Sequence, residues 1–197
     1  MEQRGFSLIE IMISSFILAL GLLGLAGMQS TAVKSTIEIE QRNLANSLLT
    51  DITERMQLNR LWLLEAGNSY QIDSLHAASL SAPSCVDSKG SFSDCSGENI
   101  KNNDLFEWKK KFTGAEINGS TLGGKGLVEA DACIAVKSAT GSSGELVEIV
   151  ISWYSTVSSK DAAANSGTTD LTATCGSGDD NKHRRQVSIE TYISKSS

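Results

Sequence analysis

The chain has 197 residues, of which 40% are hydrophobic and 20% are charged, and its formal net charge is −6. A disordered chain would contain fewer apolar residues, so the composition indicates a folded protein, and the length allows one domain of ~100–150 residues plus an anchor. The negative net charge excludes a global positive field that would recruit nucleic acid or anionic lipid.

The first element is an apolar span from Phe6 to Met28, 23 residues in which Glu10 is the only charge. A helix of that length reaches ~34 Å, enough to cross a ~30 Å hydrocarbon core. Arg4 and the terminal amine outweigh Glu2, and this positive-inside bias predicts export of the C-terminal body. Three interpretations fit the span: a secretory signal removed near its end, a plain signal anchor that tolerates Glu10, or an anchor in which Glu10 has a role.

The position of Glu10 favours the third interpretation. A charge inside a spanning helix costs up to ~2.5–3.5 kcal/mol at the centre, so such a residue usually has a partner. Cleavage between Gly5 and Phe6 would give Phe6 an α-amine with a pKa of ~7.7–8.0, one helical turn from Glu10. If such helices pack side by side with an axial stagger, each Glu10 carboxylate meets the amine of a neighbour. Glu10 is therefore predicted to direct assembly.

The stretch RGFSLIEIMI, residues 4–13, resembles the class III signal of type IV pilins: a short basic leader, glycine, phenylalanine, a few apolar residues and then glutamate. The resemblance implies that residues 1–5 are a leader peptide that a prepilin peptidase removes after Gly5. It also implies that Phe6 is the N-methylated terminus of the mature chain and that Glu10 is the assembly carboxylate.

The helical pattern continues beyond Met28. Apolar residues recur at intervals of four or seven on one face, with charged residues between them: Val33, Ile37, Leu44, Leu48, Ile52 and Met56. One helix is therefore predicted from Phe6 to Leu63, with a transmembrane and assembly half over residues 6–28 and an amphipathic half over residues 29–63. The apolar stripe of the second half must be buried, and the domain downstream is the expected cover.

Residues 64–197 are predicted to form a globular domain. Residues 65–103 are rich in Ser, Asn, Gly and Asp, which indicates an irregular connection, and DLFEWKKKF (104–112) indicates a helix. Residues 156–182 are predicted to form a long polar loop.

Three strands are predicted in this domain, at residues 132–138, 145–155 and 185–194, and apolar residues alternate with polar ones most clearly in the second and third. TGSSG (140–144) is predicted to be a hairpin turn between the first two. The expected fold class is α+β, a pilin-like long N-terminal helix packed on a small antiparallel sheet.

The four cysteines are Cys85, Cys95, Cys133 and Cys175, and none forms a C-x-x-C pair. The only histidines are His76 and His183, so the spacing of zinc ligands is absent. An even number of cysteines in an exported chain favours disulfides. Of the three pairings, Cys85–Cys95 with Cys133–Cys175 is predicted because each closes the shorter local loop.

No nucleophile, metal-binding or phosphate-binding motif appears, so we expect neither enzymatic activity nor a cofactor. Both histidines are predicted to be solvated, and Trp108 and Trp153 to lie in the core. Two basic clusters, residues 109–111 and 182–185, have the composition of a DNA contact. A charge run is more often a solvated surface and the chain is acidic, so nucleic acid is not an expected partner.

Within the pilin superfamily the layout is most similar to minor pilins of the PilV kind. The matching features are GLLGLAGMQ (21–29), NSLLTDITERMQLNR (46–60), a cysteine pair before an Asp-x-x-x-Trp helix, a strand with a cysteine and a strand with Ser-Trp. The resemblance implies a structural subunit that helps initiate type IV pilus assembly at or near the fibre tip, and so contributes to twitching motility and adhesion.

The same resemblance implies a location and partners. The chain would span the bacterial inner membrane once, with its C-terminal domain in the periplasm, and then join the pilus fibre. Expected partners are other minor pilins, the major pilin, a tip adhesin and the inner-membrane assembly platform. The alternatives are a minor pseudopilin of type II secretion and an anchored periplasmic binding module that never polymerises.

Overall fold

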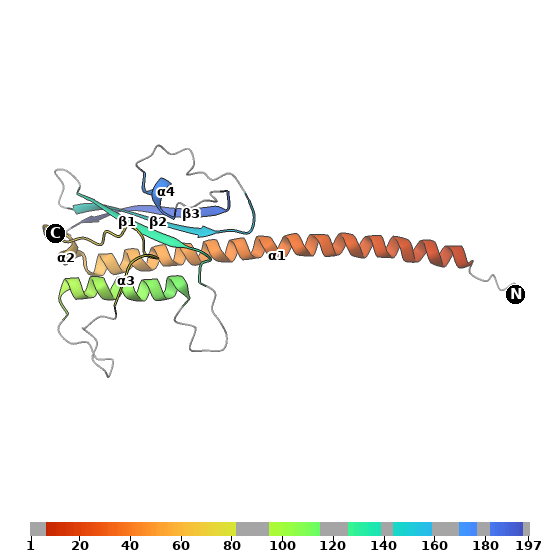
Figure 1. The fold of residues 1–197 in the computed structure, drawn as a ribbon, viewed down its shortest axis with the longest axis horizontal. Coiled ribbons are helices and arrows are strands. Elements are labelled where there is room, and N and C mark those ends of the chain that lie inside the picture. Colours follow the sequence, from red (N-terminus) through yellow and green to blue (C-terminus); the bar gives the residue numbers. More distant parts are fainter. Residues whose placement is uncertain are drawn as a thin grey trace, which may run out of the picture. The chain divides into compact units, whose positions relative to one another are not determined.

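The computed structural model describes residues 7–81, 95–114, 126–138, 144–158, 170–176 and 182–194. The chain separates into two units, residues 1–40 and residues 41–197, and each is described by itself. In chain order the elements are α1 (Leu8–Leu58), α2 (Arg60–Leu63), α3 (Gly97–Thr113), β1 (Asp131–Ser138), β2 (Gly144–Tyr154), α4 (Leu171–Thr174) and β3 (Arg184–Ser194) (Figure 1).

Helix α1 is 51 residues long and begins in the apolar span. The large apolar side chains of residues 8–40 are exposed; Leu8 is 76% exposed and Leu23 is 71% exposed. By length and composition, α1 is able to cross a membrane. Exposed apolar side chains in such number are stable only when lipid or other helices cover them.

The helix predicted to reach Leu63 is interrupted once. Helix α1 ends at Leu58, Asn59 has φ −96° and ψ 18°, and α2 follows as a separate turn. The Asn59 side-chain amide donates hydrogen bonds to Tyr70 Oη at 2.9 Å and to Gly97 O at 2.8 Å. Asparagine is a weak helix former, and these contacts with distant residues stabilise the break.

The apolar stripe of α1 is buried only in its second part. Leu48, Ile52 and Met56 lie in the main core, and Leu44 packs against it. The stripe from Val33 to Met56 was predicted to be largely covered, and this is wrong for Val33 and Ile37, which are 59% and 45% exposed. Both residues precede the folded unit, which begins at residue 41, and so they lie outside its core.

The three strands form one antiparallel sheet in the order β1-β2-β3, and the α+β prediction is confirmed. Each strand agrees with its predicted range to within one residue at either end. Ser138 pairs with Glu145, as a connection at the predicted TGSSG turn requires, but residues 139–143 lie outside the described residues.

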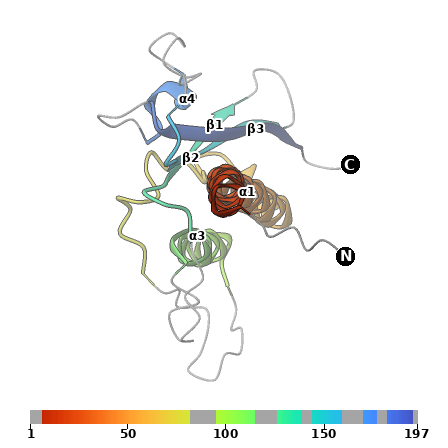
Figure 2. The ribbon, with the colours of Figure 1, turned by 90° about the vertical axis from the view of Figure 1, so that its right-hand side faces the viewer.

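Alternating residues of β2 face two different apolar clusters. Val147, Ile149, Ile151 and Trp153 join the main core, together with residues of α1 and α3. Val150 faces the other side and packs with Cys133 and Cys175. Figure 2 shows α3 and the end of α1 on one side of the sheet and α4 on the other. The central strand is therefore covered on both faces, as its apolar sequence requires.

Helix α3 is longer than predicted, because residues 97–103 are helical and not part of an irregular connection. Ser96 caps the helix by accepting a hydrogen bond from the backbone N–H of Asn99 at 3.3 Å. Ser96 at the N-cap and Glu98 in the first turn are residues that mark the start of a helix, and both can be recognised in the sequence. The loop predicted over residues 156–182 likewise contains the short helix α4.

Candidate functional site

Glu10, the predicted assembly carboxylate, lies in the first turn of α1. Its backbone N–H donates to Ser7 O at 3.0 Å, so the helix is already formed at this position. No ion pair to Glu10 occurs within the described residues. Gly5 and Phe6 lie outside them, so the cleavage point and the methylated terminus stay predictions. The carboxylate is thus presented at the start of an exposed apolar helix, where the helix dipole favours a negative charge.

A buried polar network joins the end of α1 to α3. The Tyr70 hydroxyl donates to Asp104 Oδ2 at 2.7 Å, and the Asn59 amide donates to the Tyr70 oxygen. Arg55 Nη1 donates to Asp104 Oδ1 at 3.2 Å. Asn59, Tyr70 and Asp104 are all buried, so each needs the others to satisfy its polar atoms. The network holds two helices and a loop in one arrangement.

Burial changes the ionisation of two groups in this network. Burial raises the pKa of the Asp104 carboxyl, and the hydrogen bonds from Tyr70 and Arg55 only partly oppose it. Burial also raises the pKa of Tyr70, which stays a neutral donor. At the half-exposed rim, Asp51 accepts from Arg55 Nε and from Lys111 Nζ, both at 3.1 Å. These contacts join α1, α3 and the segment around Tyr70, which indicates a structural role.

The first basic cluster is bound within the protein. Besides the pair between Lys111 and Asp51, Lys110 forms an ion pair with Glu107 at 3.3 Å. Lys109 Nζ donates to His76 O at 2.9 Å and to Ala78 O at 2.7 Å. Lys109 and Lys111 therefore hold α3 against its neighbours, and Lys110 pairs within α3.

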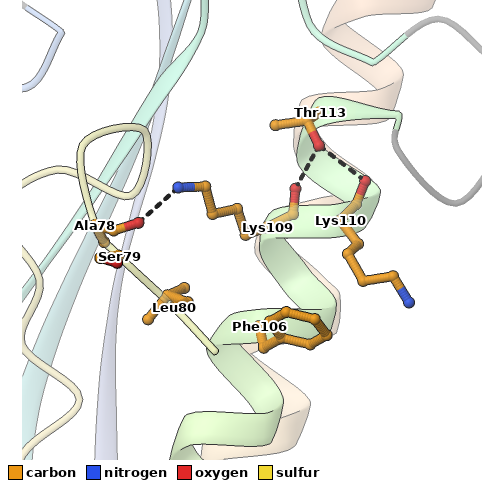
Figure 3. Close-up of a pocket in the computed structure, with 7 residues that line it drawn as sticks. All are labelled: Ala78, Ser79, Leu80, Phe106, Lys109, Lys110 and Thr113. Carbon is orange, nitrogen blue, oxygen red and sulfur yellow. Dashed lines mark hydrogen bonds between the residues drawn. The ribbon is translucent and has the colours of Figure 1, made fainter. Parts of the chain in front are cut away.

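A pocket of about 440 Å³ lies between α3 and the segment 78–80 (Figure 3). Its lining consists of Ala78, Ser79, Leu80, Phe106, Lys109, Lys110 and Thr113. Figure 3 shows the Lys109 and Lys110 side chains pointing in opposite directions. The two ammonium groups do not converge on one point, so the pocket lacks the geometry of an anion site.

The second basic cluster is less exposed than predicted. Arg184 is buried, and its Nη1 donates to Cys175 O at 3.0 Å. His183 is half-buried, stacks on the Tyr154 ring with centroids 5.1 Å apart, and has Nδ1 at 2.8 Å from Ser155 O. The prediction of a solvated histidine is correct for His76 and wrong for His183, because the strand pairing brings Tyr154 alongside it.

A disulfide joins Cys133 of β1 to Cys175, in agreement with the predicted pairing. The Gln186 amide also donates to Cys175 O, at 3.2 Å. Gly176 has φ +62°, and a Cβ there would overlap the Ser152 hydroxyl, so the loop approaches the sheet closely. Cys85 lies outside the described residues, so its pairing with Cys95 stays a prediction.

Trp108 and Trp153 are core residues, as predicted. Trp108 Nε1 donates to Leu48 O at 3.0 Å and so fixes α3 on α1. The described residues contain no cluster of three or more His, Cys, Asp or Glu side chains that could hold a metal ion. The network around Asp104 was missed by the sequence reasoning, since its members are separated by up to 49 positions and follow no motif.

The comparisons with known proteins agree with the reading of the N-terminus. Residues 1–26 match the family described as "Prokaryotic N-terminal methylation motif". No curated protein and no solved structure matches the chain. The motif, followed by an apolar helix and a small antiparallel sheet, supports a membrane-anchored protein of the type IV pilin or pseudopilin kind, processed by prepilin peptidase and assembled with other pilins.

Proposed function

We propose that this protein is a minor pilin, a structural subunit that helps initiate type IV pilus assembly and sits at or near the fibre tip. One observation carries the proposal: Glu10 of the methylation motif lies in the first turn of a helix whose large apolar side chains are exposed over residues 8–40. Where lipid or other helices cover this part of the helix, the Glu10 carboxylate needs a counter-charge, and the amine of a neighbouring Phe6 has the charge and the reach to supply it.

The proposal has a defined topology. Cleavage after Gly5 leaves Phe6 as the N-methylated terminus, the span 6–28 crosses the inner membrane once, and the C-terminal domain lies in the periplasm. Arg4 in the leader supports this orientation through the positive-inside bias. The disulfide between Cys133 and Cys175 also supports it, because such bonds persist in an oxidising compartment.

The proposed partners are other minor pilins, the major pilin, a tip adhesin and the inner-membrane assembly platform. A minor pseudopilin of type II secretion remains the second candidate, since the methylation motif supports both kinds of subunit. Deletion of the gene distinguishes the two: a minor pilin is required for fibres and twitching, and a pseudopilin is required for secretion of folded proteins.

The first experiment is mass mapping of the N-terminus of the full chain isolated from membranes. We expect the mature protein to begin at Phe6 and to carry one N-methyl group. A terminus near Met28 would show an ordinary signal peptide and overturn the proposal. A chain that still begins at Met1 in cells with active prepilin peptidase would indicate a plain signal anchor.

A further inference from the structure

The two edges of the sheet differ in how their backbone groups are satisfied. On β1, Ile134 exchanges two hydrogen bonds with Ile72, at 2.8 and 3.0 Å, and Ala132 O accepts from the Leu75 N–H at 2.8 Å. A segment of the same chain therefore covers this edge. Unpaired edge strands attract other strands, and such a cover is one way in which proteins prevent it.

The other edge, on β3, has no such cover among the described residues. All eleven residues of β3 pair with β2 in one continuous register, without a bulge. No backbone hydrogen bond to residues 186–194 from outside the strand ladder occurs in the described part of the chain. Every second residue of a paired strand directs its N–H and C=O away from its partner. Along the β3 edge, defined here as residues 186–193, no segment among the described residues pairs with this row of outward backbone donors and acceptors.

The sequence of the β3 edge contains few of the features that discourage pairing. It has no proline and no lysine, and Glu190 is its only charge. Ile189 and Tyr192 are 37% and 44% exposed, and Val187 is half-buried against the main core. Residues of these types favour strands, and an added strand would bury what they leave exposed.

The charges on the sheet indicate what the added strand must carry. Glu190 pairs with Glu148 across the ladder, and Lys137 Nζ binds Glu148 at 3.0 Å. Within the described residues no ion pair reaches the Glu190 carboxylate. The row across the sheet is Ala135, Glu148 and Glu190 and so contains two carboxylates, and the Lys137 ammonium reaches Glu148 from the neighbouring row, where Lys137 pairs with Leu146. A cation opposite Glu190 on a further strand would give this carboxylate an opposite charge, because directly opposed residues lie within about 5.5 Å.

We propose that the β3 edge binds an extended segment of another polypeptide chain, antiparallel to β3, with a lysine or arginine opposite Glu190 and an apolar residue opposite Ile189. Antiparallel pairing gives the straighter hydrogen bonds. This inference depends on β3 and not on Glu10. Binding at the β3 edge can therefore fail while the role of Glu10 in assembly holds, and the role of Glu10 can fail while binding at the β3 edge holds.

The probe is the heptapeptide TVKVTVT, whose lysine faces Glu190 and whose three valines face Val187, Ile189 and Thr191 when it pairs antiparallel with residues 186–192. Binding of the labelled peptide to the full chain in detergent is followed by fluorescence anisotropy. We expect saturable binding, and Glu190→Lys should weaken it up to about fivefold. The peptide TVEVTVT should show the opposite preference, for Glu190→Lys over the wild type.

Two controls test whether backbone hydrogen bonds bind the peptide and whether another segment of the chain already pairs with the β3 edge. N-methylation of the peptide amides that face β3 should abolish binding, and N-methylation of the alternate amides should not. Equal effects of the two sets, or failure of TVKVTVT to bind, would overturn the proposal.

Hydrogen exchange provides the second control: backbone amides of residues 186–193 that point away from β2 should exchange fast in the isolated chain and slowly when TVKVTVT is bound. Slow exchange of all of them in the isolated chain would mean that another segment of the same chain covers the edge, and the proposal would be wrong.

Discussion

The two parts of helix α1 contain the same kinds of apolar residue in opposite surroundings. Ile39 is 58% exposed, and Ile52 is fully buried in the main core. Backbone hydrogen bonding is the same in both parts, so the difference lies in what covers the side chains. The apolar residues Leu48, Ile52 and Met56 are covered by their own chain, and the apolar residues of 8–40 require other molecules to cover them. Helix α1 therefore connects a domain with its own core to a segment whose exposed apolar side chains can contact lipid or other subunits.

The largest expected effect is in the exposed part. Glu10→Val should leave membrane insertion and cleavage after Gly5 intact, because it removes an ionisable group from the span. Fibres on cells and co-purification with other pilins should be lost almost completely, since the amine of the neighbouring subunit loses its counter-charge. The measurements are N-terminal mass, fibre counts and pull-down from membranes.

The matched control for this variant is Glu40→Gln, which removes an exposed carboxylate from the far end of the same unit. It should assemble normally. Glu10→Asp retains the charge with a shorter reach, so a partial defect is expected. Normal fibre counts for Glu10→Val would mean that the carboxylate is incidental.

A second pair of variants compares an isoleucine in the buried part of α1 with an isoleucine in its exposed part. Ile52→Ala should lower the free energy of unfolding by about 2–5 kcal/mol, because it leaves a cavity in the main core. Ile39→Ala should change it by less than about 0.5 kcal/mol. Denaturant unfolding of the full chain in detergent, followed by tryptophan fluorescence, measures both. Equal losses would show that residue 39 is also covered by its own chain.

The polar network gives a smaller effect, confined to the folded unit. Tyr70→Phe removes the hydroxyl that donates to Asp104 and accepts from Asn59, leaving both buried groups short of a partner. The expected loss of unfolding free energy is about 1–3 kcal/mol. Tyr192→Phe, at an exposed position, is the control and should be neutral. If both changes are neutral, water replaces the hydroxyl and the network is not needed for stability.

The smallest effect is a pH dependence of the network. Burial raises the pKa of Asp104 in the folded protein above its value in the unfolded chain, so folding favours the protonated carboxyl. The stabilisation from Asp104 is fully present below its unfolded pKa of ~3.9 and is lost as the pH rises through the folded pKa. The difference in unfolding free energy between wild type and Asp104→Asn should therefore fall as the pH rises above ~4. A difference that rises with pH would contradict the direction of this shift.

Patterns within short stretches of sequence predicted much of the fold. The alternation along residues 145–155 placed β2 to within one residue, because a strand repeats every two residues whatever its neighbours are. The apolar span with Glu10 likewise follows from length and charge alone. The start of α3 was missed although Ser96 and Glu98 signal it, because the polar composition around them suggested a loop.

The tertiary structure decided where the helix breaks and which part of its stripe is covered. Helix α1 ends just before Asn59, whose side-chain amide donates hydrogen bonds to Tyr70 Oη and Gly97 O. Neither acceptor lies in α1, so this end depends on residues from elsewhere in the chain. Val33 and Ile52 follow one periodic pattern, yet only Ile52 has the sheet and α3 beside it. Periodicity determines which residues share a face of a helix, whereas burial depends on what the rest of the chain can reach.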